Sequence, residues 1–315
     1  MLYKEDSCCR RGNPTAAIFL KQKGGKRVST KVERVWIVGA NGRVGKEFAK
    51  LLDTRETELV QTDIEDVDVT DLEAVMYYAD VNRPEVIINC AGITDVEECE
   101  RNKEDAFRVN ALGARNLSVA ARRIKATLVQ LSTDDIFNGH SEIPYDEFAT
   151  PFPLSNYGRS KLAGENFVKD LAQKYLIIRS SWVYGAGENF VTDILEQAKV
   201  TKKIPVAGNQ FASPTSAKEV AKCIHRLIQA GAYGTYNATT LGYCSRYEFA
   251  QKIVELAGLD VEIVRVPNSE IPGSELRPSY AVLDNLMLRI SGIETPVSWQ
   301  EALEDYMREN GYLKQ

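Results

Sequence analysis

The chain has 315 residues, of which 44% are hydrophobic, and its 39 basic and 44 acidic side chains give a formal net charge of −5. This composition is typical of a folded protein without bulk attraction to nucleic acid, so no nucleic-acid partner is expected. No apolar run reaches the about 18 residues of a membrane helix, and the six cysteines show no metal-ligand spacing. We therefore expect a cytoplasmic protein with reduced thiols, no membrane partner and no bound metal.

Residues 1–31 carry eight basic and two acidic side chains without apolar periodicity, which predicts a disordered tail. Lys23, Gly24 and Gly25 could be encoded by a purine-rich ribosome-binding sequence that precedes Val28. Under this hypothesis Val28 is the first residue translated in the native host. N-terminal sequencing of the native protein tests it, because an intact Met1 would contradict it.

A glycine turn follows the first apolar strand, which is expected at residues 34–38. The turn opens a helix expected over 44–52, and in that setting backbone N–H groups and a helix N-terminus can receive a pyrophosphate. The alternative is an ordinary strand-to-helix turn with structural glycines. The predicted dinucleotide contacts in the turn are Gly39, Asn41, Gly42, Arg43, Val44 and Gly45.

Candidate cofactor contacts also follow the next two strands, expected at 58–62 and 86–89. Asp63 could accept hydrogen bonds from the adenosine ribose, whereas Arg43 could pair with a 2′-phosphate that Asp63 would repel, so NADPH and NADH both stay open. Strand-end packing is the alternative for the other positions. These further predicted cofactor contacts are Asp68, Val69, Cys90, Ala91, Gly92 and Asn110.

A Tyr-x-x-x-Lys step forms the predicted catalytic centre. Tyr157 and Lys161 lie on one face of a helix, so the ammonium is expected to lower the pKa of the phenol towards neutrality and make it a proton donor. Thr133, after the strand expected at 127–131, is predicted to hold a substrate carbonyl beside the phenol, and Lys161 to bind the nicotinamide ribose. The alternative is a loop-capping threonine and a surface helix pair.

The alternating elements predict an α/β fold with a Rossmann-type, doubly wound parallel sheet. Further helices are expected at 70–82, 111–124, 190–199, 218–229, 245–257 and 298–310, with strands at 176–179 and 262–266. Ser-x-x-Glu or Thr-x-x-Glu capping boxes open three of these helices. We expect an NAD(P)-binding domain over 32–185 and a smaller C-terminal α/β lobe over 186–315 that binds mainly substrate, with elements at about 212–238 returning to the first domain.

The chain resembles the extended short-chain dehydrogenases/reductases, and within them the dTDP-4-dehydrorhamnose reductases. Besides the glycine turn, Tyr157 and Lys161, the segments that carry the resemblance are 89–97, 132–137, 179–185, 209–215 and 277–284. The resemblance implies that NADPH or NADH reduces the C4 keto group of dTDP-4-dehydro-L-rhamnose, giving dTDP-L-rhamnose for cell-surface polysaccharide. Tyr157 would protonate the new alkoxide. The implied substrate contacts are Thr94, Val96, Thr133, Asp134, Trp182 and Asn189.

The chain departs from the family pattern in several places. Cys90 and Gly92 stand where alanines are usual, and Asp135 stands where a tyrosine is usual, which alters the surroundings of the nicotinamide and the sugar. Some members dimerise through magnesium held by glutamates. Glu47 matches one such position, but Lys218 falls where another acid would be needed, so a metal is not predicted, and the protein is expected to be a monomer or a homodimer.

Two other functions fit the same fold. A nucleotide-sugar epimerase or dehydratase is one, although a dehydratase commonly has an Asp-Glu pair beside the threonine, and here Asp134 and Asp135 are followed by Ile136. A non-catalytic, cofactor-binding regulatory subunit is the other. A Tyr157→Phe variant separates this last reading from an enzyme, because only an enzyme would lose turnover.

Overall fold

The computed structural model describes residues 34–52 and 54–314, and its central feature is a six-stranded, all-parallel sheet. The strands lie in the order β10-β5-β4-β3-β1-β2, so the order reverses beside β1, as in a doubly wound fold. The predicted fold class is confirmed. The strands are β1 (Arg34–Val38), β2 (Glu58–Thr62), β3 (Val86–Asn89), β4 (Thr127–Thr133), β5 (Lys174–Ser180) and β10 (Gly234–Asn237).

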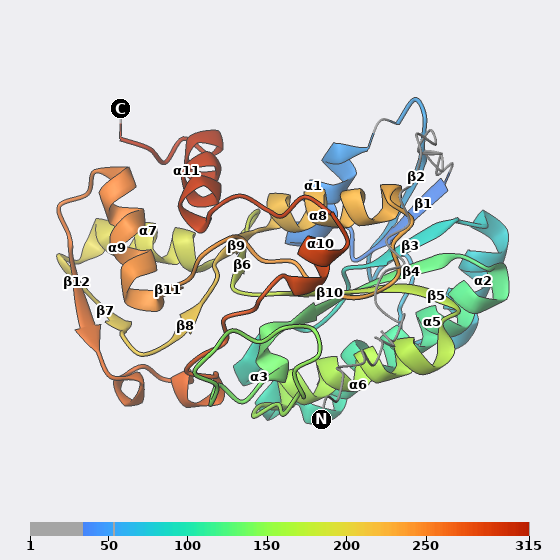
Figure 1. Cartoon of the computed structure of the whole chain (residues 1–315), viewed down its shortest axis with the longest axis horizontal. Coiled ribbons are helices and arrows are strands. Elements are labelled where there is room, and N and C mark those ends of the chain that lie inside the picture. Colours follow the sequence, from blue (N-terminus) through green and yellow to red (C-terminus); the bar gives the residue numbers. More distant parts are fainter. Residues whose placement is uncertain (1–33, 53, 315) are drawn as a thin grey trace, which may run out of the picture.

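Helices cover both faces of this sheet (Figure 1). Successive residues of β1 point to opposite faces: Val35 and Ile37 join the core under α1 (Arg43–Leu51) and α8 (Ala217–Gln229), whereas Trp36 and Val38 join the core on the other face. Because strands buried on both faces need apolar side chains throughout, β1 and β3 read as continuous hydrophobic runs. The helices of the second face are α2 (Leu72–Asn82), α5 (Gly113–Ile124) and α6 (Asn156–Leu171).

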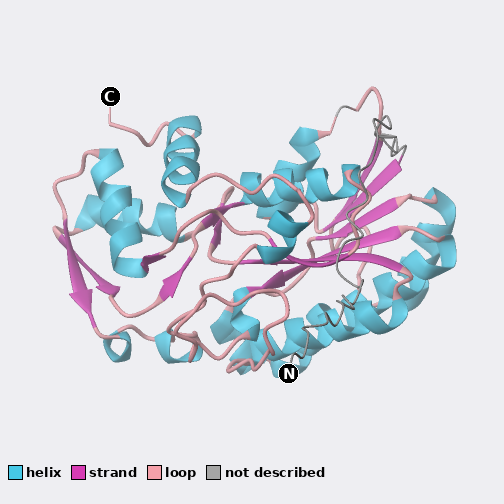
Figure 2. Cartoon of the chain, viewed as in Figure 1, coloured by secondary structure: helices cyan, strands magenta, loops and turns pink. Residues whose placement is uncertain are grey.

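A smaller group of elements lies at the other end of the molecule, around a core of its own (Figure 2). Its two-stranded parallel sheet pairs β7 (Lys203–Ala207) with β12 (Glu262–Val266). Phe249, Leu303 and Met307 are buried in its core. The helices around it are α7 (Phe190–Val200), α9 (Arg246–Ala257) and α11 (Trp299–Glu309), and the short pairs are β6 (Val183–Tyr184) with β9 (Thr215–Ser216) and β8 (Phe211–Ala212) with β11 (Cys244–Ser245).

Between β9 and β11 of the smaller group, residues 217–237 return to the main sheet. Helix α8 packs against α1, and β10 then adds to the outer edge of β5, with Thr235 opposite Ile177. Short α10 (Leu286–Ile290) packs on β10. The last strand of the main sheet is therefore supplied by the second half of the chain.

The capping boxes were predicted with mixed success. Those at Ser245 and Ser298 are confirmed. In each, the serine hydroxyl accepts a hydrogen bond from the backbone N–H of the glutamate three residues later, and the carboxylate of that glutamate accepts one from the backbone N–H of the serine. The box at Thr70 is wrong, because the cap of α2 is Asp71, whose side chain accepts from the N–H groups of the two residues Glu73 and Ala74. An aspartate one position later offers a charged acceptor in better register for the same N–H groups.

Three short helices before α5 were not expected. Helices α3 (Val96–Arg101) and α4 (Lys103–Phe107) lead into a π-helical turn, Arg108–Leu112, and α5 therefore begins at Gly113 instead of 111. Strand β10 was not expected either, because Gly-Thr-Tyr-Asn lacks the apolar pattern of a buried strand.

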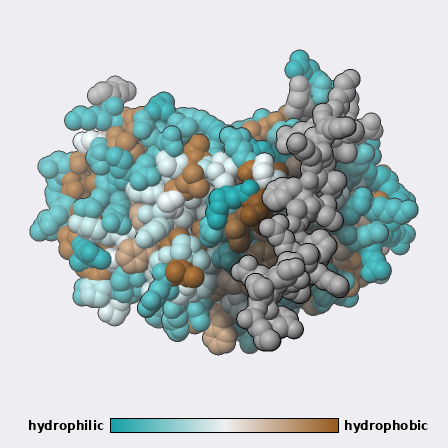
Figure 3. All heavy atoms as spheres, viewed as in Figure 1, coloured by the Kyte–Doolittle hydropathy of each residue, from teal (hydrophilic) through white to brown (hydrophobic). Residues whose placement is uncertain are grey.

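The exterior matches a protein that folds around buried apolar cores. The face shown in Figure 3 is mainly hydrophilic, with apolar side chains in small, separate groups. Over residues 34–52 and 54–314, none of the helices has both the length and the apolar character needed to cross a bilayer. The hypotheses on the tail and on Val28 lie outside the described residues.

Candidate functional site

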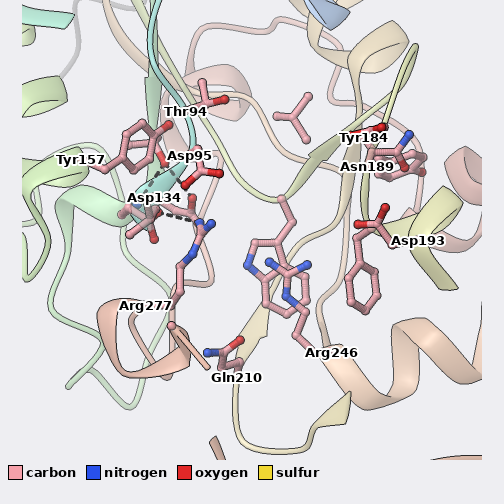
Figure 4. Close-up of a pocket in the computed structure, with 18 of the residues that line it drawn as sticks. Thr94, Asp95, Asp134, Tyr157, Tyr184, Asn189, Asp193, Gln210, Arg246 and Arg277 are labelled. Carbon is pink, nitrogen blue, oxygen red and sulfur yellow. Dashed lines mark hydrogen bonds and ion pairs between the residues drawn. The ribbon is translucent and has the colours of Figure 1, made fainter. Parts of the chain in front are cut away.

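A cavity of about 800 Å³ opens at the carboxyl ends of the parallel strands, between the main sheet and the smaller group of elements. Figure 4 shows Tyr157 and Asp134 on one side of it and Asn189 and Asp193 on the other. The predicted site residues that line it are Gly42, Arg43, Val44, Cys90, Ala91, Gly92, Thr94, Val96, Thr133, Asp134, Tyr157, Lys161, Trp182 and Asn189. Those outside its lining are Gly39, Asn41, Gly45, Asp63, Asp68, Val69 and Asn110.

The glycine turn is held tightly against its neighbours. Gly39 has a φ of +72°, and a Cβ on it would lie 2.6 Å from the backbone nitrogen of Ala91. A Cβ on Gly45 would lie 2.8 Å from the Gly39 carbonyl oxygen. Helix α1 has Gly42 as its N-cap, without a side-chain cap, so backbone N–H groups of its first turn remain for an anion. The turn therefore fits the pyrophosphate of a dinucleotide.

Asp63 lies at the edge of this turn. Its Oδ2 accepts from the backbone nitrogen of Asn41 at 3.0 Å, and its Oδ1 accepts from that of Ile64 at 2.9 Å. Two other predicted cofactor contacts already have partners within the protein. Asp68 accepts a hydrogen bond from the backbone nitrogen of Thr70, and the Val69 side chain is buried in the core. The cofactor contacts of Asp68 and Val69 stay predictions.

The side chain of Asn110 holds the loop after β3 through hydrogen bonds to its backbone. Its Oδ1 accepts from the backbone nitrogen of Ile93 at 2.9 Å, and its Nδ2 donates to the Ile93 carbonyl and to Ser160 Oγ, both at 3.0 Å. A Cβ on Gly92 would lie 2.8 Å from Asn110 Oδ1 and 3.7 Å from Lys161 Nζ. Asn110 thus fixes the loop that passes beside the Lys161 ammonium.

Thr133 and Asp134 end β4 in a hydrogen-bonded group. Thr133 Oγ1 donates to Asp134 Oδ1 at 3.1 Å, and Ser181 Oγ donates to Asp134 Oδ2 at 2.6 Å. Burial, with a further contribution from the charge of Asp135, raises the pKa of Asp134 to about 7, against the opposing hydrogen bonds from Ser181 and Thr133. Asp134 can therefore hold or release a proton near neutral pH.

Tyr157 and Lys161 lie on the buried face of α6. The first turn of the helix packs tightly on the segment after β4, since a Cβ on Gly158 would lie 2.1 Å from the Asp135 carbonyl oxygen. Burial raises the pKa of Tyr157 above its usual value, and the charge of Asp135 raises it further. The expected lowering of this pKa by Lys161 is wrong for this structure, because burial dominates. Burial also lowers the pKa of Lys161 to about 8, against the opposing charge of Glu165.

A buried ion pair anchors this helix to the sheet. Arg179 on β5 donates through Nε and Nη2 to the two carboxylate oxygens of Glu165, at 2.9 and 2.8 Å, and Ser132 Oγ donates to Glu165 Oε1 at 2.7 Å. Burial works to raise the pKa of Glu165, but the hydrogen bond and charge of Arg179 outweigh it and keep the pKa below its usual value. The helix that carries Tyr157 is thereby tied to the strand that ends at Thr133.

Two arginines in the cavity were not predicted. Arg277 forms an ion pair with Asp135 at 3.0 Å, and the Arg246 guanidinium lies 3.8 Å from the ring centre of Trp182 and 4.8 Å from that of Phe190. Burial, with the nearby charge of Arg277, lowers the pKa of Arg246 to about 9. The sequence position of Arg246 could have marked it as a candidate site residue. It is the first residue of α9, and a cation there is unfavourable because it faces the positive end of the helix dipole.

The remaining predicted substrate contacts line the rim. Trp182 has a φ of +42°, a left-handed conformation that a bulky residue rarely adopts, which is typical of a functional position. Asn189 caps α7 and donates to the carbonyls of Gly185 and Gly187, each at 2.8 Å. Its polar atoms thus already hold the rim loop, so its contact with substrate stays a prediction, as do those of Thr94 and Val96.

The comparison with protein families decides the class of protein. Residues 33–311 match the RmlD substrate binding domain family, which is most of the chain. The chain belongs to the RmlD family.

Similar proteins point to the same group. The chain is 39% identical to a dTDP-4-dehydrorhamnose reductase of Bacillus anthracis solved in complex with NADP, with a TM-score of 0.86 over 88% of this chain and 99% of that one. It is 36% identical over 272 residues to a dTDP-4-keto-6-deoxy-D-glucose reductase of Streptomyces niveus, covering 85% of this chain and 94% of the relative. It is 34% identical over 277 residues to the spore coat polysaccharide biosynthesis protein SpsK of Bacillus subtilis, covering 88% and 97%.

The two positions considered above for a metal-bridged dimer, Glu47 and Lys218, each form an ion pair in this structure. Glu47 is bound to Lys50 at 2.6 Å, and Lys218 is paired with Glu309. Within residues 34–52 and 54–314, no group of three or more His, Cys, Asp or Glu side chains is arranged to hold a metal ion. The carboxylate of Glu47 is therefore already paired with the ammonium of Lys50.

Proposed function

We propose that this RmlD-family chain is an NAD(P)H-dependent reductase that converts the C4 keto group of dTDP-4-dehydro-L-rhamnose to the hydroxyl of dTDP-L-rhamnose, for cell-surface polysaccharide. The observation that carries the proposal is that Thr133, Tyr157 and Lys161 line one cavity together with Gly42 of the glycine turn. When bound, the reduced nicotinamide supplies the hydride. The family and its named relatives support this activity.

The chain's own side chains would handle the proton. The buried phenol of Tyr157 is fully protonated at neutral pH, so it is an acid that can donate to the oxygen on C4 as negative charge develops there. Thr133 would donate a hydrogen bond to the same oxygen. Lys161, held against the loop at Gly92, would bind the nicotinamide ribose and place positive charge beside the resulting phenolate.

We also propose a division of labour between the two parts of the molecule. Residues 32–185, with the elements at about 212–238, would bind the coenzyme, and the rest of 186–315 would bind mainly the nucleotide sugar. Arg246 and Arg277 would face its diphosphate, because guanidinium groups match phosphate oxygens with paired donors. A cytoplasmic location, and a monomer or homodimer, belong to the same proposal.

The ion pair at Asp135 argues against a dehydratase. A dehydratase would need a second acid–base group beside the threonine, but the Asp135 carboxylate is bound to Arg277 at 3.0 Å and is not free for proton transfer. The solved epimerase of Thermus thermophilus is 23% identical, a likeness that shows the fold alone.

The test is the loss of reduced-nicotinamide absorbance when the purified protein meets dTDP-4-dehydro-L-rhamnose. Tyr157→Phe should lower kcat by about 10²- to 10⁴-fold, the contribution of a positioned general acid. The matched control is Tyr233→Phe, because Tyr233 is 51% exposed and outside the cavity. Reduction of dTDP-4-keto-6-deoxy-D-glucose in place of dTDP-4-dehydro-L-rhamnose would show that the chain acts on a different keto sugar from the one proposed. Undiminished turnover by Tyr157→Phe would refute the mechanism.

A further inference from the structure

We propose that Asp134 holds the proton that restores Tyr157 after each turnover, and that it passes this proton on through the hydroxyl of Thr133. The inference rests on the proposed reductase function and deepens it, because that reaction takes one proton from the phenol in every cycle. Tyr157 and Thr133 are only 7% and 6% exposed. With coenzyme and sugar seated, a proton from bulk water therefore has to reach the phenolate through other side chains.

A set of hydrogen bonds joins Asp134 to Tyr157, on the same side of the cavity (Figure 4). Thr133 Oγ1 lies 3.1 Å from Asp134 Oδ1, and its hydrogen bond to the phenol works to lower the pKa of Tyr157, against the larger effect of burial. The backbone nitrogen of Asp135 donates to Thr133 Oγ1 at 3.2 Å, which occupies one lone pair. One lone pair and one hydrogen remain, so this hydroxyl can accept a proton from Asp134 while it donates one to Tyr157.

The transfer moves one proton along two hydrogen bonds. Once the C4 oxygen has become a hydroxyl, Thr133 can turn its hydrogen from that oxygen to the phenolate. The Thr133 O–H bond breaks as the Tyr157 O–H bond forms, and the Asp134 O–H bond breaks as a new O–H bond forms on Thr133. The electron pair of each broken bond stays on its oxygen, so Asp134 is left as a carboxylate, which water reprotonates before the next cycle.

The surroundings of Asp134 allow it both to hold a proton and to release it. Burial, with the charge of Asp135, raises its pKa to about 7, so it is a stronger acid than the buried phenol and is partly protonated near neutral pH. After release, Ser181 Oγ stabilises the carboxylate at 2.6 Å from Oδ2. Two further charges face it: Arg277 lowers its pKa, and Arg246 has a pKa that burial lowers and the charge of Asp134 raises.

Lys161 is the alternative source of the proton, since burial lowers its pKa to about 8, against the opposing charge of Glu165. A proton taken from Lys161 would remove the positive charge that the proposed mechanism places beside the phenolate and the nicotinamide ribose. Asp134 can release its proton without that loss.

The experiment follows coenzyme oxidation from the first turnover onward in Asp134→Asn, a variant of equal size that can still accept from Thr133. Because Tyr157 starts protonated, the first turnover should proceed within about threefold of the wild-type rate, and later turnovers should be at least about tenfold slower. The time course then shows a burst of about one coenzyme per active site. If Asp134 only held the sugar or the local structure, the first turnover would slow as much as the later ones, and this result would overturn the proposal.

The pH dependence identifies the group. Wild-type kcat should fall above about pH 7, and Ser181→Ala should move this fall to higher pH, because it removes a hydrogen bond that lowers the pKa of Asp134. Asp193→Asn is the matched control, since Asp193 lines the other side of the cavity and its loss should leave the fall in place. A fall that Ser181→Ala leaves unmoved, or one that Asp193→Asn abolishes, would overturn the proposal.

A measurement without sugar keeps this proposal separate from the proposed function. The infrared difference spectrum between wild type and Asp134→Asn should contain a protonated carboxyl band at about pH 6 that is lost by about pH 8 and that shifts in Thr133→Val. If the sugar is not reduced while this band is present, only the proposed function fails. A missing band, or one that Thr133→Val leaves unchanged, would overturn the role of Asp134.

Discussion

Asp135 and Arg277 form an ion pair of 3.0 Å across the cavity, joining the segment after β4 to a loop that lies 142 positions further along the chain. Both charges act on Asp134, and in opposite senses: Asp135 raises its pKa, and Arg277 lowers it. The pair thereby balances the electrostatics beside Tyr157, whose pKa Asp135 raises and Arg277 lowers.

Removing either partner of this pair should shift the pKa of Asp134 in opposite directions. Asp135→Asn deletes the like charge, so we expect a pKa lower than in wild type by about one unit; Arg277→Gln deletes the opposite charge and should raise it by a similar amount. Carboxyl-carbon NMR titration of Asp134, assigned through Asp134→Asn, measures both. Shifts of the same sign would show that the two groups do not act as a balanced pair.

Asp134 should make the protein less stable as the pH rises from about 4 to 7. Its pKa in the folded protein, about 7, lies above the ordinary value of 3.8, so the folded state holds a proton that the unfolded state loses first. The stability that this proton contributes is fully present below about pH 4 and is lost by about pH 7. Relative to wild type, Asp134→Asn should therefore gain up to about 4 kcal/mol in unfolding free energy across this window.

Urea unfolding of both proteins at several pH values measures this difference, and Asp170→Asn, at an exposed position of α6, is the matched control. A constant difference between wild type and Asp134→Asn would contradict a proton held by Asp134.

Arg246 should matter for the sugar nucleotide and not for the coenzyme. Arg246→Lys keeps the charge but loses the flat guanidinium that lies over Trp182 and Phe190. A desolvated contact of this kind is worth about 1–2 kcal/mol, so KM for the nucleotide sugar should rise roughly tenfold at unchanged coenzyme KM. Arg265→Lys, which alters a similar contact with Tyr247 outside the cavity, is the control. Equal effects on both KM values would count against the assignment.

Glu165 should contribute more to stability than any exposed acid. Its side chain is 0% exposed and that of Arg179 2%, so Glu165→Ala leaves a buried cation unpaired and should cost roughly 3–5 kcal/mol. Glu196→Ala, which breaks a pair whose side chains are 68% and 65% exposed, should cost under about 1 kcal/mol. Denaturant unfolding of the two variants compares them directly, and similar losses would mean that the buried pair has no special role.

The main sheet was predictable from the sequence because its strands follow local rules. Buried parallel strands need unbroken apolar runs, and the glycines at 39 and 45 are required by backbone atoms only a few residues or one strand away. Strand β10 could not be predicted this way, since its pairing with β5 depends on the long-range return of α8, and its own residues are largely polar.

That Thr133, Tyr157 and Lys161 line one cavity was also predictable, but their electrostatics were not. Tyr157 and Lys161 share a helix face because of their spacing, whereas the pKa of Tyr157 depends on burial and on Asp135, which only the folded cavity brings together. Arg277 begins one of the segments that carry the family resemblance, but the sequence predicted no role for it. Its partner lies in another element, and no local pattern in the sequence connects the two.

The position of β10 constrains how the chain can be made and divided. The outer edge of β5 has no hydrogen-bonded neighbour until residues 234–237 arrive, long after β5 itself has left the ribosome. During synthesis that edge is open to mispairing with other chains. A protein cut between β5 and β10 would therefore yield two incomplete pieces, so splitting or shortening this chain for expression should keep residues 34–237 together.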